Sequence, residues 1–363
     1  MTGSEATIYE VADHAGVSIA TVSRVINNSA KVRPETRQRV EAAMKQLKFV
    51  PSMAARGLSG GKSRSIGLAY PMYESAATFN TSCEEDSNVL YFDTIIRGAS
   101  AQASALGYSL FTCTTGPDHS RGLLPIQQLS STIDGLILAD RVMSDAEAAR
   151  WGKKLPVVLL SGSSNVKFGA TVRADNETGM RELVEHLAHV HNVKRIGFMC
   201  GIETSPDSID RLRTITEAAS RLKMSLLSSD ILIGDYSMMR AEVAMERRIT
   251  FGDELPEAII CANDQMAVGV IHTLREHGLS VPKDILVTGF DDYPIARMTS
   301  PALTTVRQSG FGLGVSAVNL MVGLLEGTTE KGTTVTLPTE LVVRRSCGCP
   351  AKASRHSKSE KSK

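Results

Sequence analysis

The spacing of apolar residues changes once along the chain, and the change separates two kinds of structure. Within residues 7–47 apolar side chains recur at three- and four-residue steps, as at Val40, Ala43 and Leu47, which is typical of short amphipathic helices. From Ser65 onwards, apolar runs of strand length alternate with longer helical segments. The pattern predicts a small helical unit followed by a much larger α/β unit.

The first unit has the local signals of three helices. Thr7 and Glu10 have the spacing of a capping box, which starts the first helix. Gly16 is suited to the turn that follows, because glycine adopts positive φ without strain. Ser18 can cap the second helix, and Pro34 begins the third, PETRQRVEAAMKQL. The order and the short turn are typical of a helix-turn-helix unit.

The larger unit contains apolar runs that we predict to be strands: SIGLAY, YSLFTCT, DGLILA, PVVLLS, RIGFMCG, AIICAND and DILVTGF. Helical segments such as FDTIIRGASAQASALG and ETGMRELVEHLAHV lie between several of them. Alternation of this kind indicates doubly wound parallel sheets, and about 280 residues are more than one such sheet needs. We therefore predict a small all-α headpiece and an α/β body of two lobes.

One face of the second helix is left for a partner outside the chain. Val22 and Val25 pack onto the first helix, so the remaining side chains point outward. A major groove accepts one helix, and an arginine such as Arg24 offers two parallel donors to a guanine edge, while hydroxyl and basic groups hold phosphates. The candidate DNA contacts of the headpiece are Thr7, Ser18, Ile19, Ala20, Thr21, Ser23, Arg24, Asn27 and Arg33.

The charge distribution supports this interpretation. The net charge is +1, but residues 1–64 carry +5, residues 344–363 carry +6 and the segment between them carries −10. A basic head on an acidic body indicates that the head faces a polyanion. A plain three-helix bundle with a solvated charged face remains the alternative.

The segment ATIYEVADHAGVSIATVSRVINNSAKVRPETRQRVEAAMKQLKFVPSMAARGL closely resembles the headpiece of the LacI/GalR (lactose-repressor/galactose-repressor) family. The resemblance continues to about Ser346 through DGLIL, ANDQMAVG, TGFDD and LTTVRQ, in the family's order. It implies a body like that of periplasmic sugar-binding proteins and a homodimer or tetramer on palindromic operators; no leucine heptad follows the body, so we expect a dimer. The expected domains are a headpiece at 5–50, a hinge helix and linker at 51–64, an effector-binding and dimerisation body at 65–346 and a basic disordered tail at 347–363.

The resemblance also implies a role for the linker. In the family this segment folds into a hinge helix on the operator, and a leucine from each subunit enters the central minor-groove step. The matching residue is Leu58, with Ala55 and Arg56 beside it. Two apolar wedges would unstack one base step and bend the operator towards both heads. A flexible tether in which Leu58 makes no contact is the alternative.

Polar residues follow several of the predicted strands, where doubly wound sheets collect ligands. By resemblance, Arg211, which we place at the start of the helix RLRTITEAASRL, Asn263 and Asp291 match effector-contacting positions, and Tyr236 matches an aromatic that packs on the ligand. These groups suit a ring of hydroxyls, so we expect a sugar or sugar derivative. A nucleobase corepressor and a controlling protein partner remain alternatives, and ligand binding could release or strengthen operator binding. Asp292 is expected to cap a helix or join the lobes.

Two departures from the family pattern concern this site. Thr214 and Ile215 stand where the family usually has Gly-Phe, and residues 72–91 replace a short loop. That insertion carries the acidic run EED at 84–86, which is a solvated loop tip or an acidic flap that disfavours an anionic effector.

Other functions find little support in the sequence. No phosphate-binding or dinucleotide glycine motif follows a predicted strand, and Cys347 and Cys349 are expected to lack partner ligands, so we expect no catalytic activity, cofactor or metal. No apolar run approaches the roughly 20 residues of a membrane helix, and the start of the chain lacks a secretory apolar region. We therefore expect a cytoplasmic protein rather than an exported sugar-binding protein.

Overall fold

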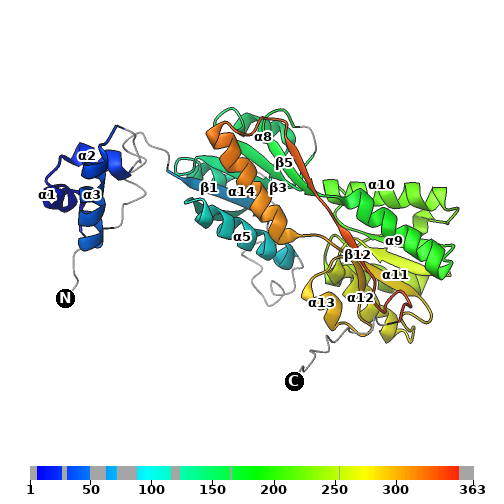
Figure 1. The fold of residues 1–363 in the computed structure, drawn as a ribbon. Helices are drawn as coiled ribbons and strands as arrows, with labels where there is room; N and C mark the ends of the chain where they lie inside the picture. The colour runs from blue at the N-terminus through cyan, green and yellow to red at the C-terminus, as the bar shows by residue number, and fades with distance from the viewer. Residues whose placement is uncertain are drawn as a thin grey trace, which may run out of the picture.

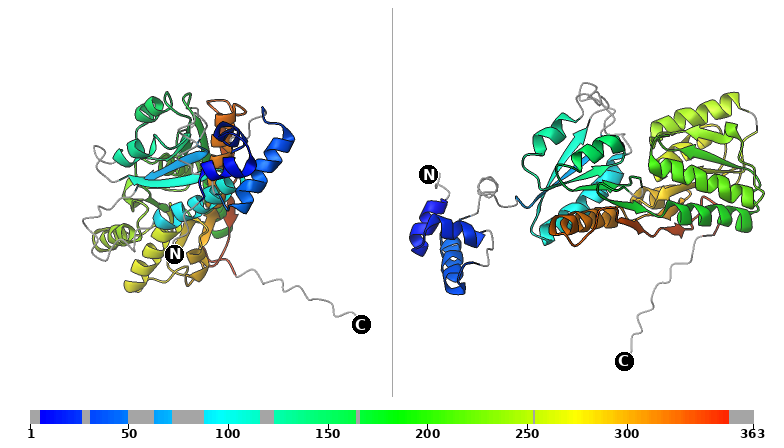
Figure 2. Two further views of the ribbon diagram at one scale, coloured as in Figure 1. Left: turned by 90° about the vertical axis from the view of Figure 1, so that its left-hand side faces the viewer. Right: turned by 90° about the horizontal axis from the view of Figure 1, so that it is seen from above.

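The computed structural model describes residues 6–26, 31–49, 63–71, 88–115, 123–163, 166–252 and 254–350. A helical headpiece is followed by two α/β lobes, and the headpiece lies beyond the first lobe, away from the second (Figures 1 and 2). This arrangement confirms the predicted fold class. No helix of the described ranges is long and apolar enough to cross a membrane.

The headpiece consists of α1 (Ile8–Ala15), α2 (Ile19–Ile26) and α3 (Pro34–Gln46). The capping box is present, since the Thr7 backbone N donates to Glu10 Oε2 at 2.6 Å and the Glu10 N donates to Thr7 Oγ1 at 3.4 Å. Gly16 ends α1 with φ of 62°, as the turn requires. Val22 of α2 is fully buried among apolar residues of α1 and α3. The local predictions for this unit are confirmed.

The first lobe, here called the N-lobe, is built on a six-stranded sheet of order β11-β5-β4-β3-β1-β2, in which all pairs are parallel. Its strands are β1 (Ser65–Pro71), β2 (Ser109–Thr115), β3 (Gly135–Ala139), β4 (Val157–Leu160), β5 (Ala170–Ala174) and β11 (Thr334–Leu337). Its helices are α5 (Asn88–Ala105), α7 (Leu124–Leu129), α8 (Asp145–Trp151) and α14 (Gly310–Glu326).

Helices α5 and α14 approach each other closely because glycines lie where they meet. A Cβ added to Gly314 would lie 2.1 Å from the Ile95 carbonyl oxygen, and one added to Gly98 would lie 2.1 Å from the Phe311 carbonyl oxygen. Side chains at these positions would force the two helices apart.

The second lobe, the C-lobe, has a sheet of order β12-β10-β9-β8-β6-β7, parallel except that β12 runs antiparallel to β10. Its strands are β6 (Ile196–Cys200), β7 (Ile231–Ile233), β8 (Ala258–Cys261), β9 (Leu286–Asp291), β10 (Thr304–Arg307) and β12 (Glu340–Val342). Its helices are α9 (Asn176–His191), α10 (Pro206–Arg221), the 3-10 helix η3 (Ser228–Asp230), α11 (Met238–Phe251), α12 (Asp264–Glu276) and α13 (Pro294–Met298).

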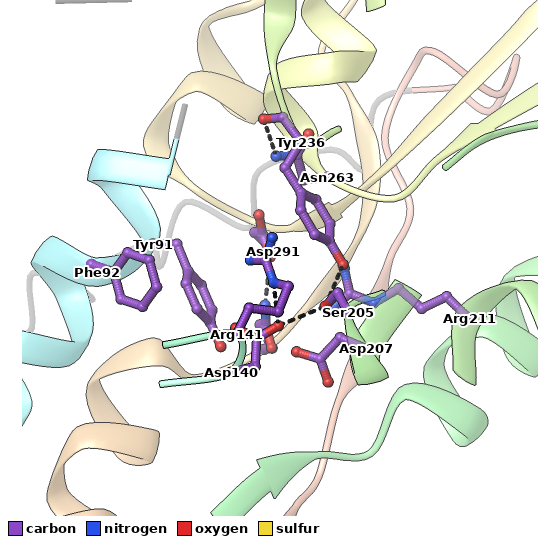
Figure 3. A pocket seen from close by; sticks show the side chains of 11 residues that line it. Tyr91, Phe92, Asp140, Arg141, Ser205, Asp207, Arg211, Tyr236, Asn263 and Asp291 are labelled. Carbon is purple, nitrogen blue, oxygen red and sulfur yellow. Dashed lines mark hydrogen bonds and ion pairs between the residues drawn. The ribbon is translucent and has the colours of Figure 1, made fainter. Parts of the chain in front are cut away.

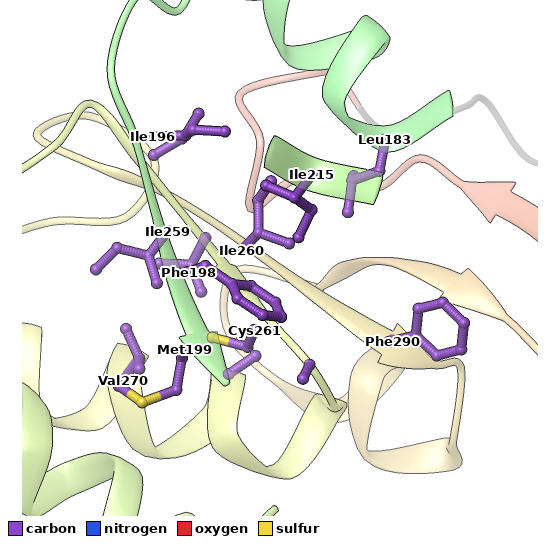
Figure 4. Packing of buried hydrophobic residues seen from close by; sticks show 14 of the residues in the cluster. Leu183, Ile196, Phe198, Met199, Ile215, Ile259, Ile260, Cys261, Val270 and Phe290 are labelled. Carbon is purple, nitrogen blue, oxygen red and sulfur yellow. The ribbon is translucent and has the colours of Figure 1, made fainter. Parts of the chain in front are cut away.

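The core of the C-lobe lies on both faces of its sheet. Phe198 of β6 and Ile260 of β8 are fully buried between Leu183 and Ile215 on one side and Val270 on the other (Figure 4). The helices α9 and α10 cover one face, and α11 and α12 cover the other. Strands buried on both faces explain the continuous apolar runs in the sequence.

The chain passes between the lobes three times: from β5 to α9, from β10 to α14 and from β11 to β12. Two of the crossing segments are joined, because the Asp175 N donates to the Leu337 carbonyl and Thr339 Oγ1 donates to the Asp175 carbonyl, both at 2.8 Å. The lobes are therefore connected by adjacent segments.

The start of the body is fixed to the N-lobe. The Ser63 N donates to Asp134 Oδ1 at 3.0 Å, the Ser65 N donates to Asp134 Oδ2 at 3.2 Å, and Ser63 Oγ donates to the Thr132 carbonyl at 2.9 Å. The predicted linker thus ends in a segment that is bonded to the loop before β3.

The boundaries of the body differ from the prediction in two places. Helix α5 begins at Asn88, so the last residues of the 72–91 insertion are helical. The body extends past residue 346, since Cys347 is fully buried in the C-lobe core. Each of the predicted strands is present, whereas β5, β7, β10, β11 and β12 lie outside the apolar runs predicted to be strands.

Candidate functional site

The second helix of the headpiece presents the face that the sequence predicts. Ile19 is 41% exposed, Ala20 and Arg24 are exposed and Ser23 is partly exposed, whereas Val22 and Val25 are buried. Ile19 and Arg24 are both exposed on this short helix, and an apolar and a basic side chain together suit a groove that offers both thymine methyl groups and acceptor edges. Contact with DNA stays a prediction for these residues.

The remaining predicted DNA contacts lie at helix starts or outside the described residues. Ser18 Oγ accepts from the Thr21 N at 3.2 Å, and the Thr7 hydroxyl donates to Glu10 Oε2 at 3.0 Å, so both hydroxyls already serve as helix caps. Arg33 is exposed directly before α3. The structure does not describe Asn27, Ala55, Arg56, Leu58 or the EED run.

A cavity between the two lobes brings the four predicted effector residues together (Figure 3). In each sheet the strand order changes direction at the first strand of the lobe, which is β1 in the N-lobe and β6 in the C-lobe. Ligands of doubly wound sheets bind at such a point, beside the carboxyl ends of the strands. The N-lobe contributes Tyr91, Phe92, Asp140 and Arg141, and the C-lobe contributes Ser205, Asp207, Arg211, Tyr236, Asn263, Asp291 and Gln308.

Arg211 is held rigidly in the wall of this cavity. Its guanidinium carbon lies 3.6 Å from the centre of the Phe290 ring, its Nε donates to Asn176 Oδ1 at 2.8 Å and its Nη1 donates to the Ala262 carbonyl. The prediction that Arg211 begins its helix is wrong, because α10 starts at Pro206 and places Arg211 in its second turn. The earlier start is explained by Pro206, which suits a first helical position.

Asn263 and Tyr236 support each other. Asn263 Oδ1 accepts from the Met266 N at 2.8 Å and so caps α12, and its Nδ2 donates to the Tyr236 carbonyl at 3.1 Å. The Tyr236 ring lies against Gly201, where an added Cβ would be 2.2 Å from the ring. The Tyr236 hydroxyl is 3.5 Å from Ser205 Oγ. Both residues therefore have structural contacts as well as a place in the cavity wall.

Two carboxyl groups in the cavity have raised pKa values. Burial raises the pKa of Asp291 to about 7, although Arg211 and a hydrogen bond from Gln308 Nε2, 2.5 Å from Asp291 Oδ1, act in the opposite direction. Burial also raises the pKa of Asp207, which accepts a hydrogen bond from Asn176 Nδ2 at 2.7 Å. Near neutral pH Asp291 can thus be present in its protonated as well as its ionised form.

The backbone is also strained at two residues of the cavity wall. Tyr236 has φ of 61° and Asp291 has φ of 118°, in the left-handed region that favours glycine. Strained residues of this kind are concentrated at ligand sites. Asp292 also has positive φ but does not line the cavity; it accepts from Arg307 Nε at 2.8 Å and pairs with Arg344, so it acts within the C-lobe rather than between the lobes.

The two lobes are joined by a hydrogen bond in the wall of the cavity. Ser205 Oγ of the C-lobe donates to Asp140 Oδ2 of the N-lobe at 2.8 Å, and Arg141 Nε donates to the same oxygen at 2.9 Å. The remaining space of about 30 Å³ is enough for about two water molecules. A larger ligand requires these side chains to move or the lobes to separate.

Several residues of the cavity are not predicted from the sequence: Tyr91, Phe92, Asp140, Arg141, Ser205, Asp207 and Gln308. Asp140 and Arg141 directly follow the predicted strand DGLILA, so the rule that ligands collect at strand ends would have found them. Tyr91 lies at the end of the 72–91 insertion. The only feature of the sequence there that indicates a ligand site is the pair of adjacent aromatic residues, Tyr91 and Phe92.

A second group of polar residues corrects an expectation about the cysteines. The expectation that Cys347 and Cys349 lack partner ligands is wrong, because the side chains of His186 and His191 lie beside them. The histidines are on α9, far away in the sequence, so the spacing of the cysteines gives no indication of them.

Comparisons with known proteins agree with this architecture. Residues 7–52 match the profile of bacterial regulatory proteins of the lacI family, and residues 184–347 match a periplasmic binding protein-like domain. The chain is 31% identical to the HTH-type transcriptional repressor PurR of Haemophilus influenzae strain PittEE, over 94% of this chain and 98% of that protein.

Solved structures give the same result. The lac repressor dimer bound to operator and the anti-inducer ONPF aligns with a TM-score of 0.78 and 29% identity, over 94% of this chain and 99% of that chain. The complex of the transcriptional regulator CelR with cellobiose aligns with a TM-score of 0.65 and 25% identity, over the same shares. The chain therefore belongs to the LacI family of DNA-binding bacterial transcriptional repressors.

Proposed function

We propose that this repressor acts as a homodimer on a palindromic operator and that a small neutral ring compound bound between the lobes controls it. The observation that carries the proposal is the convergence of Arg211, Tyr236, Asn263 and Asp291 on one interlobe cavity. Two headpieces related by twofold symmetry read two half-sites, which makes the operator palindromic. The relative whose structure is a dimer on its operator supports this assembly.

The polar groups of the cavity favour a ligand rich in hydroxyls, such as a monosaccharide or disaccharide. Gln308 Oε1 is buried and has no hydrogen-bond partner among the described residues, so a ligand group that donates a hydrogen bond would satisfy it. Asp140, Asp207 and Asp291 add acceptors, and Arg141 and Arg211 add donors. A hydroxyl group both donates and accepts, so a sugar ring can satisfy both kinds of group. The cellobiose complex of the relative CelR supports the same class.

A nucleobase is the second candidate because of the aromatic residues. Tyr91 and Phe92 of the N-lobe and Tyr236 of the C-lobe line the cavity (Figure 3). Aromatic rings in offset stacks stabilise flat heterocycles, and a base also offers the ring N–H donor that Gln308 requires. Binding of a nucleobase would depend on stacking against the aromatic rings, whereas binding of a sugar would depend on hydrogen bonds to the carboxyl groups.

The ligand would act through the relative arrangement of the lobes. The hydrogen bond between Ser205 and Asp140 joins the two lobes in the cavity wall. A ligand that replaces this hydrogen bond changes the stability of one relative position of the lobes compared with another. The operator affinity then shifts by the ligand's differential affinity for the two arrangements. The predicted hinge helix at 51–64, with Leu58 as a minor-groove wedge, would carry this change to the headpieces. We propose no catalytic role for the cavity.

A selection from a randomised duplex library, followed by thermal-shift measurements with sugars and nucleobases in the presence and absence of the selected duplex, tests the proposal. We expect an enriched sequence with twofold symmetry and one ligand class that changes both the melting temperature and operator affinity. Asp291→Asn should weaken the binding of a sugar more than that of a base, and Tyr236→Ala should weaken the binding of a base more than that of a sugar. Enrichment of no symmetric sequence would refute the proposal, and a response to cell extract alone would indicate a protein partner.

A further inference from the structure

Four potential metal ligands meet on the C-lobe, away from the interlobe cavity. His186 and His191 lie in the last turns of α9, and Cys347 and Cys349 lie in the turn after β12. One nitrogen or sulfur atom from each residue lies within 4.8 Å of all the others. Neither cysteine is in a disulfide. The combination of two thiols and two imidazoles is a known ligand set for Zn²⁺.

Four of the six distances between these atoms match those of a tetrahedral zinc site. With Zn–N of about 2.05 Å and Zn–S of about 2.3 Å, tetrahedral geometry places two nitrogens about 3.3 Å apart and a nitrogen and a sulfur about 3.6 Å apart. Nε2 of His186 and Nε2 of His191 are 3.3 Å apart. His186 Nε2 lies 3.5 Å from Cys347 Sγ and 3.7 Å from Cys349 Sγ, and His191 Nε2 lies 3.5 Å from Cys349 Sγ.

The backbone around the cysteines is shaped to present both sulfurs together. Gly348, between them, has φ of 90°, which a residue with a side chain rarely adopts. Its N donates to the Arg345 carbonyl at 2.9 Å and closes the turn. The turn is anchored, because Ser346 Oγ accepts from the Thr304 N at 2.8 Å and donates to the Val287 carbonyl at 2.5 Å. The arrangement therefore does not depend on the cluster alone.

A hydroxyl group beside the cluster can donate a hydrogen bond to one of the sulfurs. Thr304 Oγ1 lies 3.1 Å from Cys347 Sγ and can donate to it, as residues behind a metal ligand commonly do. Cys347 is fully buried, and the other three residues are partly exposed. Two thiolates and two neutral imidazoles balance the charge of Zn²⁺, so the occupied site would carry no net charge into the core.

We propose that His186, His191, Cys347 and Cys349 form a structural Zn²⁺ site that joins the end of the body to α9. Four protein ligands complete a tetrahedron and leave no position for substrate, which distinguishes a structural site from a catalytic one. The site joins segments that are about 160 residues apart in the sequence. It fixes the far end of the helix whose first residue, Asn176, contacts Arg211 and Asp207 in the interlobe cavity.

Metal analysis of the tag-free full-length protein tests this proposal. After dialysis against metal-free buffer, we expect about one zinc per chain in the wild type. His191→Asn and Cys349→Ser should lose most of it and should melt at a lower temperature that added zinc no longer raises. The matched controls are His189→Asn, an exposed histidine of the same helix, and Cys113→Ser in β2, and both should keep the metal.

Cobalt substitution gives an independent reading on the wild type alone. Co²⁺ added to the metal-free protein should show the intense visible bands of tetrahedral coordination and the near-ultraviolet bands of thiolate ligation, and zinc should displace it. Absence of both bands together with absence of zinc would overturn the proposal, as would equal metal loss in the His189→Asn control. A Cys347–Cys349 disulfide in protein purified under reducing conditions would also overturn it.

Discussion

The raised pKa of Asp291 leads to a prediction about stability. Its pKa is about 7 in the folded protein against an ordinary value of 3.8, because the carboxyl group is buried. Between about pH 4 and pH 7 the folded protein keeps a proton that the unfolded chain releases. The free energy of unfolding therefore falls as the pH rises through this window, and the loss is complete above pH 7. A difference of about three pKa units corresponds to at most about 4 kcal/mol.

Asp291→Asn removes this titration and keeps the shape of the side chain. The asparagine oxygen can still accept from Gln308 Nε2. The wild type and the variant should have similar stability at about pH 4, where Asp291 is protonated in the folded protein and only about half ionised in the unfolded chain. At about pH 8 the variant should be more stable by about 2–4 kcal/mol, since it does not ionise. Burial also raises the pKa values of Asp207 and Asp264, so part of the pH dependence remains in the variant. The share of Asp264 becomes smaller there, because the charge of Asp291 also raises the pKa of Asp264.

Urea unfolding at a series of pH values, with hydrogen exchange of β9 as the local reading, measures the effect on the C-lobe. A lobe-specific reading is needed because a chain of several units need not unfold in one step. Asp93→Asn is the control, since the Asp93 side chain is 52% exposed in α5. If the variant and the wild type lost stability in parallel as the pH rose, burial would not destabilise the ionised form of Asp291 and the reasoning would be refuted.

Four further predictions concern the headpiece and the N-lobe. Arg24→Ala should remove about 1–3 kcal/mol of discrimination between operator and scrambled duplex without changing the melting temperature, and an unchanged preference would contradict the predicted contact. Leu58→Ala, at a position outside the described residues, should weaken specific binding more than non-specific binding in titrations, and equal losses would count against the wedge. Operator affinity should fall steeply with added salt, because phosphate contacts release counterions, and a flat salt series would oppose this. Gly314→Ala should lower N-lobe stability in urea by about 1–3 kcal/mol, because its Cβ would lie 2.1 Å from the Ile95 carbonyl oxygen; an unchanged midpoint would show that α5 and α14 separate easily.

Local signals were sufficient for the headpiece. The Thr7–Glu10 capping box and the Gly16 turn depend on residues a few positions apart, so the sequence contains the whole reason for them. In the body, strands buried on both faces are recognisable as apolar runs, whereas the short strands β11 and β12 at the sheet edges have no such run and depend on their partners. Their place follows from the tertiary fold and not from the local pattern.

The cavity shows the same division between local and distant information. Asn263 and Asp291 follow apolar strands, and the rule for strand ends finds them. The identity of the facing side chains, Tyr91 and Arg141 among them, depends on how the two lobes are placed, which three crossing segments determine together. The pairing of α9 histidines with Cys347 and Cys349 also depends on the tertiary fold, because it joins chain segments that share no local pattern.

The bonds from Ser63 and Ser65 to the loop before β3 have a consequence for communication between the two ends of the molecule. Because these hydrogen bonds fix Ser63 and Ser65 to the N-lobe, both residues move with that lobe when it tilts. In a symmetric pair, the separation of the two Ser63 positions would then be set by the lobes alone. Gly60 and Gly61 lie just before this bonded point in the sequence, so if the proposed ligand tilts the N-lobe, it also moves the point at which the linker joins the body.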